Sequence, residues 1–233
     1  MCFPMPRLGY NVNIKIEKVD AYSLDTGVLE QAARLITRGG VVVCPTDTGY
    51  AFSASALDAR AVAKVYNLKG RSYSNPIHIA VSSIEEAGKY AHVDDAARLL
   101  AERFLPGALT LVMPRREIMP NMLVAGRDTV GIRIPDNAVI LNLVEIAERP
   151  LTTTSANISG RPTPYSVEEV LKQLEEAGKD VMLVLDQGPL SGRELSTIVD
   201  ISVKPPQLIR QGRVSWLEIR EVLKKLPEPD GTL

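Results

Sequence analysis

Three cationic side chains, Lys64, Lys69 and Arg71, lie close together in the sequence, and Asn75-Pro76 follows them. A mobile lysine and a planar guanidinium suit phosphate oxygens, and together they suit a triphosphate better than a single carboxylate. Cations also gather at the C-terminal ends of helices, where the helix dipole attracts them. The segment is therefore open to two interpretations, a phosphate-binding site and a helix-end effect.

A second candidate is Arg133, which interrupts the apolar run Gly131-Ile132-Arg133-Ile134. A charged side chain buried in such a run needs a partner. One interpretation is a structural ion pair with a carboxylate elsewhere in the chain, and the other is a clamp for the carboxylate of a substrate. The sequence alone leaves both open.

Hydroxyl groups are concentrated in two further segments. Thr152-Thr153-Thr154-Ser155 leads into Ala156-Asn157, and capping a helix would need only one of these hydroxyls. The chain has two histidines, His78 and His92, and neither lies in a recognisable triad setting, so we interpret the hydroxyls as hydrogen-bond donors and not as nucleophiles. The other segment, Pro45–Tyr50, fits a turn held by Asp and Thr side chains, with a small polar ligand as the alternative.

Composition and missing motifs narrow the class of function. The chain carries 27 basic and 28 acidic residues, so a site for a polyanion has to be a local cluster. It contains no G-x-x-x-x-G-K-[ST] loop, no G-x-G-x-x-G after a strand and no Cys/His cluster with zinc-ligand spacing. These absences exclude ordinary P-loop, Rossmann and zinc sites. We expect His78 to be a strand residue that faces polar surroundings.

Cysteine usage and the N-terminus bear on location. The two cysteines, Cys2 and Cys44, argue against a disulfide scaffold and for a reducing compartment. The N-terminus contains two prolines and no continuous apolar core, so it does not fit a signal peptide. No apolar run approaches the roughly 20 residues that span a bilayer. We therefore expect a cytoplasmic protein with no membrane contact.

The candidate residues lie at the ends of predicted strands, where open α/β sheets collect ligands. Apolar runs and alternation predict strands at 12–16, 41–44, 77–81, 109–113, 131–134, 151–154, 181–185, 196–201 and 207–210. Helical periodicity predicts helices from a cap at Asp25 to Gly39-Gly40, and at 58–68, 84–90, 94–104, 138–148, 167–174 and 216–225. The alternation favours an α/β layered sheet whose late strands are antiparallel, in a single domain over 1–233 that ends in a disordered tail at 227–233.

Taken together, these motifs resemble the YrdC-like family of threonylcarbamoyl-AMP synthases, from about Gly39 to Gly212 (39–212) and in the family's order. The matching residues are Pro45-Thr46-Asp47-Thr48 with Tyr50, Lys69-Gly70-Arg71 with Asn75-Pro76, Leu105-Pro106-Gly107 with Leu109-Thr110, Val130-Gly131-Ile132-Arg133-Ile134-Pro135, Thr154-Ser155-Ala156-Asn157-Ile158-Ser159-Gly160, Ser196-Thr197-Ile198-Val199-Asp200, and Arg210. Each motif alone is weak, and their occurrence in sequence makes the match specific.

The resemblance implies a twisted open mixed sheet with flanking helices around a concave basic cleft. It also implies a nucleotidyltransferase reaction, in which bicarbonate carboxylates L-threonine and the carbamate oxygen attacks the α-phosphate of ATP. Pyrophosphate leaves, and threonylcarbamoyl-AMP passes to partner proteins that modify an adenosine in tRNA.

The resemblance also implies roles for individual residues by motif position. The threonine contacts would be Thr48, Arg133, Thr153, Ser155 and Ser196, and the ATP contacts Lys69, Arg71, Asn75, Thr129, Thr163 and Arg210. Lys69 and Arg71 would be the catalytic residues, because they can neutralise charge that grows on the phosphates. Mg²⁺ would bridge the phosphates, and no metal ligand from the protein is implied.

Four positions, Gly49, Ala51, Ser53 and Ala80, depart from the family pattern and bear on amino-acid specificity more than on ATP binding. One alternative is therefore a YrdC-like paralogue with a different substrate. The other is a non-catalytic RNA-binding module that uses the basic cleft. The aromatic content of 5% argues against this module, because single-stranded RNA readers stack bases on aromatic side chains.

Overall fold

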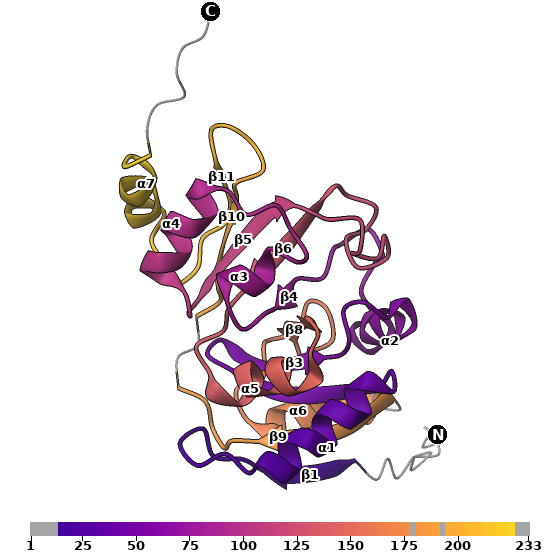
Figure 1. Cartoon of the computed structure of the whole chain (residues 1–233). Coiled ribbons are helices and arrows are strands. Elements are labelled where there is room, and N and C mark those ends of the chain that lie inside the picture. Colours follow the sequence, from indigo (N-terminus) through magenta and orange to yellow (C-terminus); the bar gives the residue numbers. More distant parts are fainter. Residues whose placement is uncertain (1–13, 178–179, 192–193, 227–233) are drawn as a thin grey trace, which may run out of the picture.

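The computed structural model describes residues 14–177, 180–191 and 194–226 (Figure 1). The predicted tail at 227–233 and the start of the first predicted strand at Val12 lie outside these ranges. The helices are α1 (Thr26–Thr37), α2 (Ala59–Lys69), α3 (Ile84–Ala87), α4 (Asp95–Phe104), α5 (Ala138–Ala147), α6 (Val167–Ala177) and α7 (Trp216–Leu223). The strands are β1 (Lys15–Lys18), β2 (Val41–Thr46), β3 (Gly49–Ser53), β4 (Ile79–Ala80), β5 (Leu109–Pro114), β6 (Thr129–Arg133), β7 (Leu151–Thr152), β8 (Thr154–Ser155), β9 (Val181–Asp186), β10 (Thr197–Asp200) and β11 (Gln207–Arg210).

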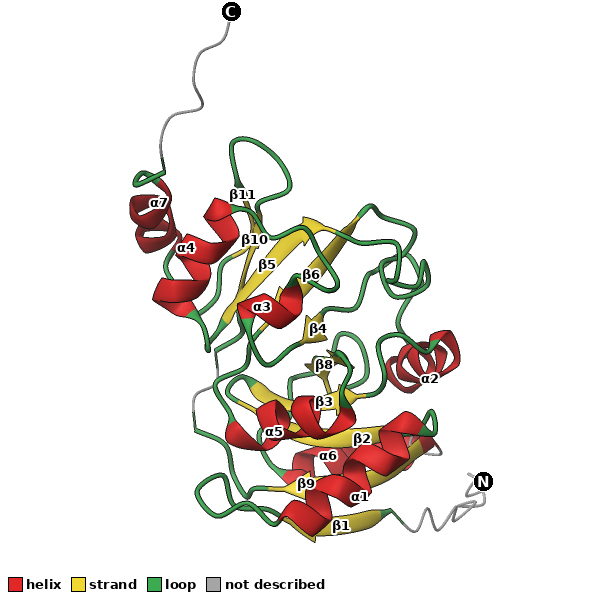
Figure 2. Cartoon of the chain, viewed as in Figure 1, coloured by secondary structure: helices red, strands yellow, loops and turns green. Residues whose placement is uncertain are grey.

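The strands form two sheets and not the one sheet that the sequence predicted. A five-stranded sheet has the order β1-β9-β2-β3-β8, and a six-stranded sheet has the order β11-β10-β5-β6-β4-β7. Figure 2 shows the two sheets one above the other, each with helices beside it. Both contain parallel and antiparallel pairs, so the mixed α/β class is confirmed. Of the late strands, β10 and β11 are antiparallel as predicted, whereas β9 runs parallel to β1 and β2.

Strand β2 is buried along its whole length because both faces of its sheet are covered. Val41 and Val43 point into the main core, and Val42 and Cys44 point into a second core that contains residues of α1 and α5. Helix α1 begins where predicted, since the Asp25 carboxylate accepts hydrogen bonds from the first backbone amides of the helix. The continuous apolar run therefore places a rigid strand directly before the polar segment that follows it.

That polar segment is the tip of a β-hairpin, because β2 pairs with β3 through a tight turn at Asp47-Thr48. Gly49 follows with a φ of +125°, which disfavours other residues. A Cβ atom at Gly49 would also lie 2.5 Å from Cγ2 of Thr163. Strand β3 was not predicted, because it is buried along its whole length and lacks the polar alternation of a half-buried strand.

The predicted strand 151–154 is divided between the two sheets. Strand β7 belongs to the six-stranded sheet, β8 belongs to the five-stranded sheet, and Thr153 lies between them. The Thr152 hydroxyl donates to the backbone oxygen of Phe52 at 3.0 Å and accepts from the backbone nitrogen of Ala54 at 3.0 Å. The hydroxyl-rich segment therefore lies where the two sheets meet.

One face of the six-stranded sheet contributes Leu109, Leu111 and Val199 to the main core, together with residues of α4 and α7. The opposite face presents a different set of side chains. Thr110, Ile198 and Arg210 lie abreast on three neighbouring strands, and Gly131, Val112 and Asp200 form the next row. All six residues line one cavity, which lies over this face. None of the helices in the described part of the chain combines the length and the apolar character needed to cross a membrane.

Candidate functional site

A cavity of about 370 Å³ lies over this open face and is lined by residues of both sheets. The predicted site residues that line it are Thr48, Arg71, Asn75, Thr129, Arg133, Thr153, Ser155, Ser196 and Arg210. The other two, Lys69 and Thr163, are not among its lining residues. Segments that are far apart in the sequence therefore converge on one hollow, and the individual ligand contacts assigned to them stay predictions.

The chain turns sharply between Lys69 and Arg71. Helix α2 ends at Gly70, which adopts the left-handed conformation with a φ of 53°. Arg71 is half-buried, and its guanidinium donates to the backbone oxygens of Asn75 at 3.1 Å and Pro76 at 3.0 Å. Burial lowers the pKa of Arg71. These neutral acceptors orient the guanidinium beside the cavity without cancelling its charge.

Arg133, unlike Arg71, has a charged partner. Its side chain is 5% exposed and forms an ion pair with Asp47, so the ion-pair interpretation is confirmed. The same guanidinium donates to the Thr48 hydroxyl at 2.5 Å and to the backbone oxygen of Gly107 at 3.2 Å. Burial lowers the pKa of Arg133, and the neighbouring carboxylate opposes this shift. Because Arg133 also lines the cavity, the clamp interpretation remains compatible with the ion pair.

Arg210 and Ser196 form a third polar group at the end of β11. The Arg210 guanidinium donates to the Ser196 backbone oxygen at 2.8 Å and to the Ser196 hydroxyl at 3.1 Å. The Thr110 hydroxyl lies 3.0 Å from the same serine hydroxyl. Burial lowers the pKa of Arg210, and the charges of Arg133 and Arg71 lower it further. The three arginines are therefore close enough to act on one another electrostatically.

His78 lies among these arginines and lines the cavity. It precedes β4 and is not part of a strand, although its surroundings are polar as expected. Burial lowers the pKa of His78 to about 4, and Arg210, Arg71 and Arg133 contribute to the shift. The ring rests against Gly131, where a Cβ atom would collide with Cδ2 of the imidazole. At neutral pH the histidine is uncharged, so the arginines provide the positive charge here.

Lys69 is only 2% exposed, and its ammonium donates to the backbone oxygens of Ser155, the last residue of β8, and Asn157. Burial lowers its pKa to about 7, with a further contribution from Arg71. Thr163 lines a separate hollow of about 560 Å³ together with Tyr165 and Lys172, and Leu195 belongs to both hollows. The ATP contacts that the resemblance implied for Lys69 and Thr163 are therefore not supported by a position in the cavity wall.

Sequence reasoning missed several lining residues, among them Thr110, Arg127 and Asp200. Thr110 and Asp200 lie in otherwise apolar strands, which is the same signal that singled out Arg133. Arg127 lies in an exposed loop, where an arginine carries no such signal. Asp200 is the one carboxylate among the described lining residues, against four arginines, so the cavity favours anions.

The four departures from the family pattern fall in different places. Gly49 and Ala51 line the cavity, so a change at either position alters its shape. Ser53 and Ala80 are fully buried and are not among the lining residues. The structure therefore limits the direct effect on ligand specificity to the first two positions.

The fold and the cavity define a mixed α/β protein with an arginine-lined hollow between two sheets. The family model Sua5_yciO_yrdC, described as telomere recombination, matches residues 34–212. The chain belongs to this family. The matched region agrees with the resemblance seen in the sequence over 39–212.

Two relatives and one solved structure show how far the similarity extends. The threonylcarbamoyl-AMP synthase of Pyrococcus abyssi is 38% identical over 196 residues, which cover 84% of this chain and 57% of that protein. A Methanocaldococcus jannaschii relative is 42% identical over 185 residues and is covered to 86% of its length. The crystal structure of P. abyssi Sua5 complexed with L-threonine has a TM-score of 0.84 and 37% identity, with 89% of this chain and 60% of that chain covered. The chain thus spans less than two thirds of the P. abyssi protein.

Proposed function

We propose that the protein condenses L-threonine, bicarbonate and ATP into threonylcarbamoyl-AMP and releases pyrophosphate. The observation that carries the proposal is the convergence of Arg71, Arg133 and Arg210 with the hydroxyls of Thr48 and Ser155 on one cavity. The activity named for the P. abyssi relative and the threonine bound to P. abyssi Sua5 support the same assignment.

The charges around the cavity suggest where each substrate binds. Arg71 and Arg210 donate to backbone and hydroxyl oxygens, so their positive charge is available to a polyanion. Arg133 is already paired with Asp47, and a neutral pair suits an amino acid zwitterion better than a triphosphate. We therefore place the phosphates near Arg71 and Arg210 and the amino acid near Arg133 and Thr48.

The reaction needs positioning and charge stabilisation more than a covalent intermediate. The threonine nitrogen forms a bond to the carbon of bicarbonate as a C–O bond breaks and water leaves, and a carbamate oxygen then forms a bond to the α-phosphorus as the bond to pyrophosphate breaks. Negative charge grows on the leaving pyrophosphate, and fixed guanidinium groups stabilise it without reorganisation. The hydroxyls of Thr153 and Ser155 line the cavity, where they can orient the amino acid.

Mg²⁺ would accompany the nucleotide. In the described part of the chain, His, Cys, Asp and Glu side chains form no group of three that could hold a metal ion. This donor set fits a magnesium ion held mainly by the phosphates, because Mg²⁺ in nucleotide sites keeps most of its waters. The ion would supply further neutralisation of phosphate charge.

The product is a mixed anhydride and would pass to proteins that transfer the threonylcarbamoyl group to an adenosine in tRNA. The exposed Arg127, which lines the cavity, would contact such a partner or the RNA itself. We place the reaction in the cytoplasm, where the buried thiol of Cys44 would stay reduced.

The test is pyrophosphate release from MgATP and bicarbonate by the purified protein, with and without threonine, and then with serine. We expect release to require threonine, and serine to be about 10- to 200-fold poorer in kcat/KM, which is the usual effect of one missing methyl group. Threonine-independent turnover would indicate a paralogue with another substrate. A protein that ignores ATP would contradict the proposal.

A further inference from the structure

Lys69 is a buried cation whose hydrogen bonds all point to one segment. Its ammonium donates to the backbone oxygen of Ser155 at 2.5 Å, to the backbone oxygen of Asn157 at 3.1 Å and to Oδ1 of Asn157 at 3.1 Å. The Ser155 hydroxyl lies 3.5 Å from the same nitrogen, and because an ammonium group has three hydrogens to donate, these contacts use its capacity. To reach a ligand in the cavity, the side chain would have to give up buried hydrogen bonds.

The backbone of Lys69 holds the same segment. Its carbonyl oxygen accepts from the amide of Ser159 at 2.8 Å, so the end of α2 contacts the segment Ser155–Ser159 at both of its ends. Strand β8 itself consists of two residues, Thr154 and Ser155. The remaining support comes from the Ala156 amide, which donates to the Tyr50 backbone oxygen at 2.8 Å, from the Ile158 amide, which donates to Oε1 of Gln173 at 3.2 Å, and from the contacts with α2.

Removing the ammonium would take a donor away from the buried backbone oxygen of Asn157, whereas the Ser155 oxygen would keep the Asn157 amide at 2.9 Å as a donor. An unsatisfied buried acceptor is costly, so the segment would shift to regain a partner. Thr153, Thr154 and Ser155 would move with it, and all three line the cavity. The geometry of the hydroxyl-bearing wall thus depends on a side chain that does not line the cavity.

We propose that Lys69 is a positioning residue, which fixes the segment Ser155–Ser159 so that the hydroxyls of Thr153 to Ser155 face the amino acid substrate. This positioning role replaces the phosphate contact that the resemblance implied for Lys69, and the inference rests on the proposed function. Arg71, two residues further on, remains on the cavity wall as the phosphate-binding group of the same turn.

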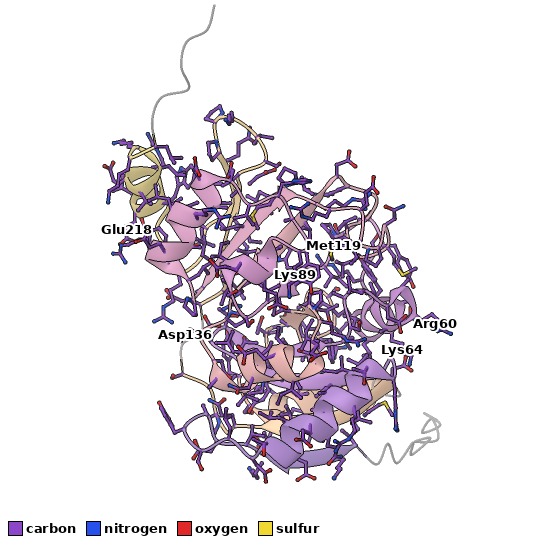
Figure 3. The ribbon with its side chains drawn as sticks, in the orientation of Figure 1. Arg60, Lys64, Lys89, Met119, Asp136 and Glu218 are labelled. Atoms are coloured by element: carbon purple, nitrogen blue, oxygen red, sulfur yellow. The ribbon has the colours of Figure 1, made fainter. Side chains whose placement is uncertain are left out.

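The experiment compares Lys69→Met with Lys64→Met. Methionine keeps the length of the side chain without a donor, and Lys64 is a matched control on α2 whose ammonium donates to the backbone oxygen of Gly39 at 2.8 Å. Figure 3 labels Lys64 at the edge of the molecule near Arg60. We expect Lys69→Met to lower kcat/KM for threonine by about 10- to 100-fold, with the KM for ATP changed by less than about threefold. Lys64→Met should change neither.

Two further measurements separate positioning from general damage. Lys69→Ala should regain activity with added methylammonium, which can occupy the vacated space, whereas Arg71→Ala should not. Asn157→Ala, which keeps the lysine but removes the Oδ1 acceptor and the amide donations to the backbone oxygens of Ile158 and Arg161, should raise the KM for threonine in the same direction. A loss of ATP affinity equal to or greater than the loss for threonine would overturn the proposal.

Hydrogen exchange tests the structural part without turnover. We expect Lys69→Met, and not Lys64→Met, to speed amide exchange in the segment 154–159. If the wild-type protein released no pyrophosphate, the proposed function would fail, and the exchange data would still decide whether Lys69 holds the segment. Unchanged exchange in Lys69→Met would overturn that role.

Discussion

The arginines of the cavity are held in two different ways. Arg71 and Arg210 donate to backbone carbonyl and serine oxygens, and both are half-buried. Arg133 is almost fully buried and is paired with Asp47. The first arrangement leaves positive charge for a ligand, whereas the second uses it within the protein. We therefore expect Arg71 and Arg210 to serve binding, and Arg133 to serve structure together with binding.

The difference teaches that burial and partner chemistry have to be read together. A buried charge without a counter-charge is expensive, and Arg133 avoids the cost through Asp47. Arg71 and Arg210 stay closer to solvent and need only dipoles around them. A substitution at Arg133 should consequently affect mainly stability, and a substitution at Arg71 should affect mainly activity. The following predictions test this difference.

The largest effect is expected at Arg133, the arginine that is paired with Asp47. Arg133→Ala leaves the buried carboxylate of Asp47 without its partner and should lower the free energy of unfolding by about 3 to 5 kcal/mol. Urea unfolding of the variant measures this loss. The double variant with Asp47→Asn should lose less than the sum of the single variants, and strict additivity would break the comparison.

At Arg71, which donates to backbone oxygens, a substitution should lower the activity more than the stability. Arg71→Ala should reduce the rate of pyrophosphate release by about 100- to 1,000-fold, because a fixed donor to the leaving group is removed. The free energy of unfolding should change by less than about 1 kcal/mol, since only bonds to carbonyl oxygens are lost. Arg60→Ala, at an exposed position on α2 (Figure 3), is the control and should leave both properties unchanged.

The contact between Gly131 and His78 offers a smaller test. In Gly131→Ala the new methyl group would collide with the ring of His78 and displace it. We expect a loss of about 1 to 3 kcal/mol in stability, as for other overpacked sites. Thermal unfolding measures it, and combination with His78→Ala should restore part of the loss. A tolerated alanine with unchanged activity would mean that this contact is not tightly packed.

The pH dependence of stability gives the smallest effect. The pKa of His78 is about 4 in the folded protein, below the usual 6.5, so between these values the unfolded chain binds more protons. Stability should therefore fall as the pH drops from 6.5 toward 4, by about 1 to 2 kcal/mol between pH 6.5 and pH 5. Urea unfolding at both pH values measures the change. His78→Gln should flatten this part of the profile, and an identical profile would contradict the assignment.

The sequence predicted the elements better than their arrangement. The cap at Asp25, the end of α2 at Gly70 and the apolar strand β2 carry local signals, and all three were found. The hairpin strand β3 was missed because burial on both faces hides its periodicity. The division of 151–155 between two sheets depends on distant strands, so no local pattern reveals it.

The residues of the candidate site were likewise easier to predict where the signal was local in the sequence. Polar residues within apolar strands, such as Arg133, pointed to the cavity, and Thr110 and Asp200 could have been found by applying that criterion further. The inward direction of Lys69 could not be predicted, because the left-handed turn at Gly70 and the position of the segment after β8 decide it together. Side-chain type suggested a phosphate contact for Lys69, which stays a prediction, and the structure shows its ammonium bonded to Ser155 and Asn157.

The passage of one short segment through both sheets bears on folding cooperativity. Thr152 belongs to the six-stranded sheet while its hydroxyl is bonded to the backbone around β3 in the other sheet. Neither sheet can lose its structure without breaking hydrogen bonds of its neighbour. The chain should therefore melt in a single calorimetric transition, even though its apolar residues form two separate clusters.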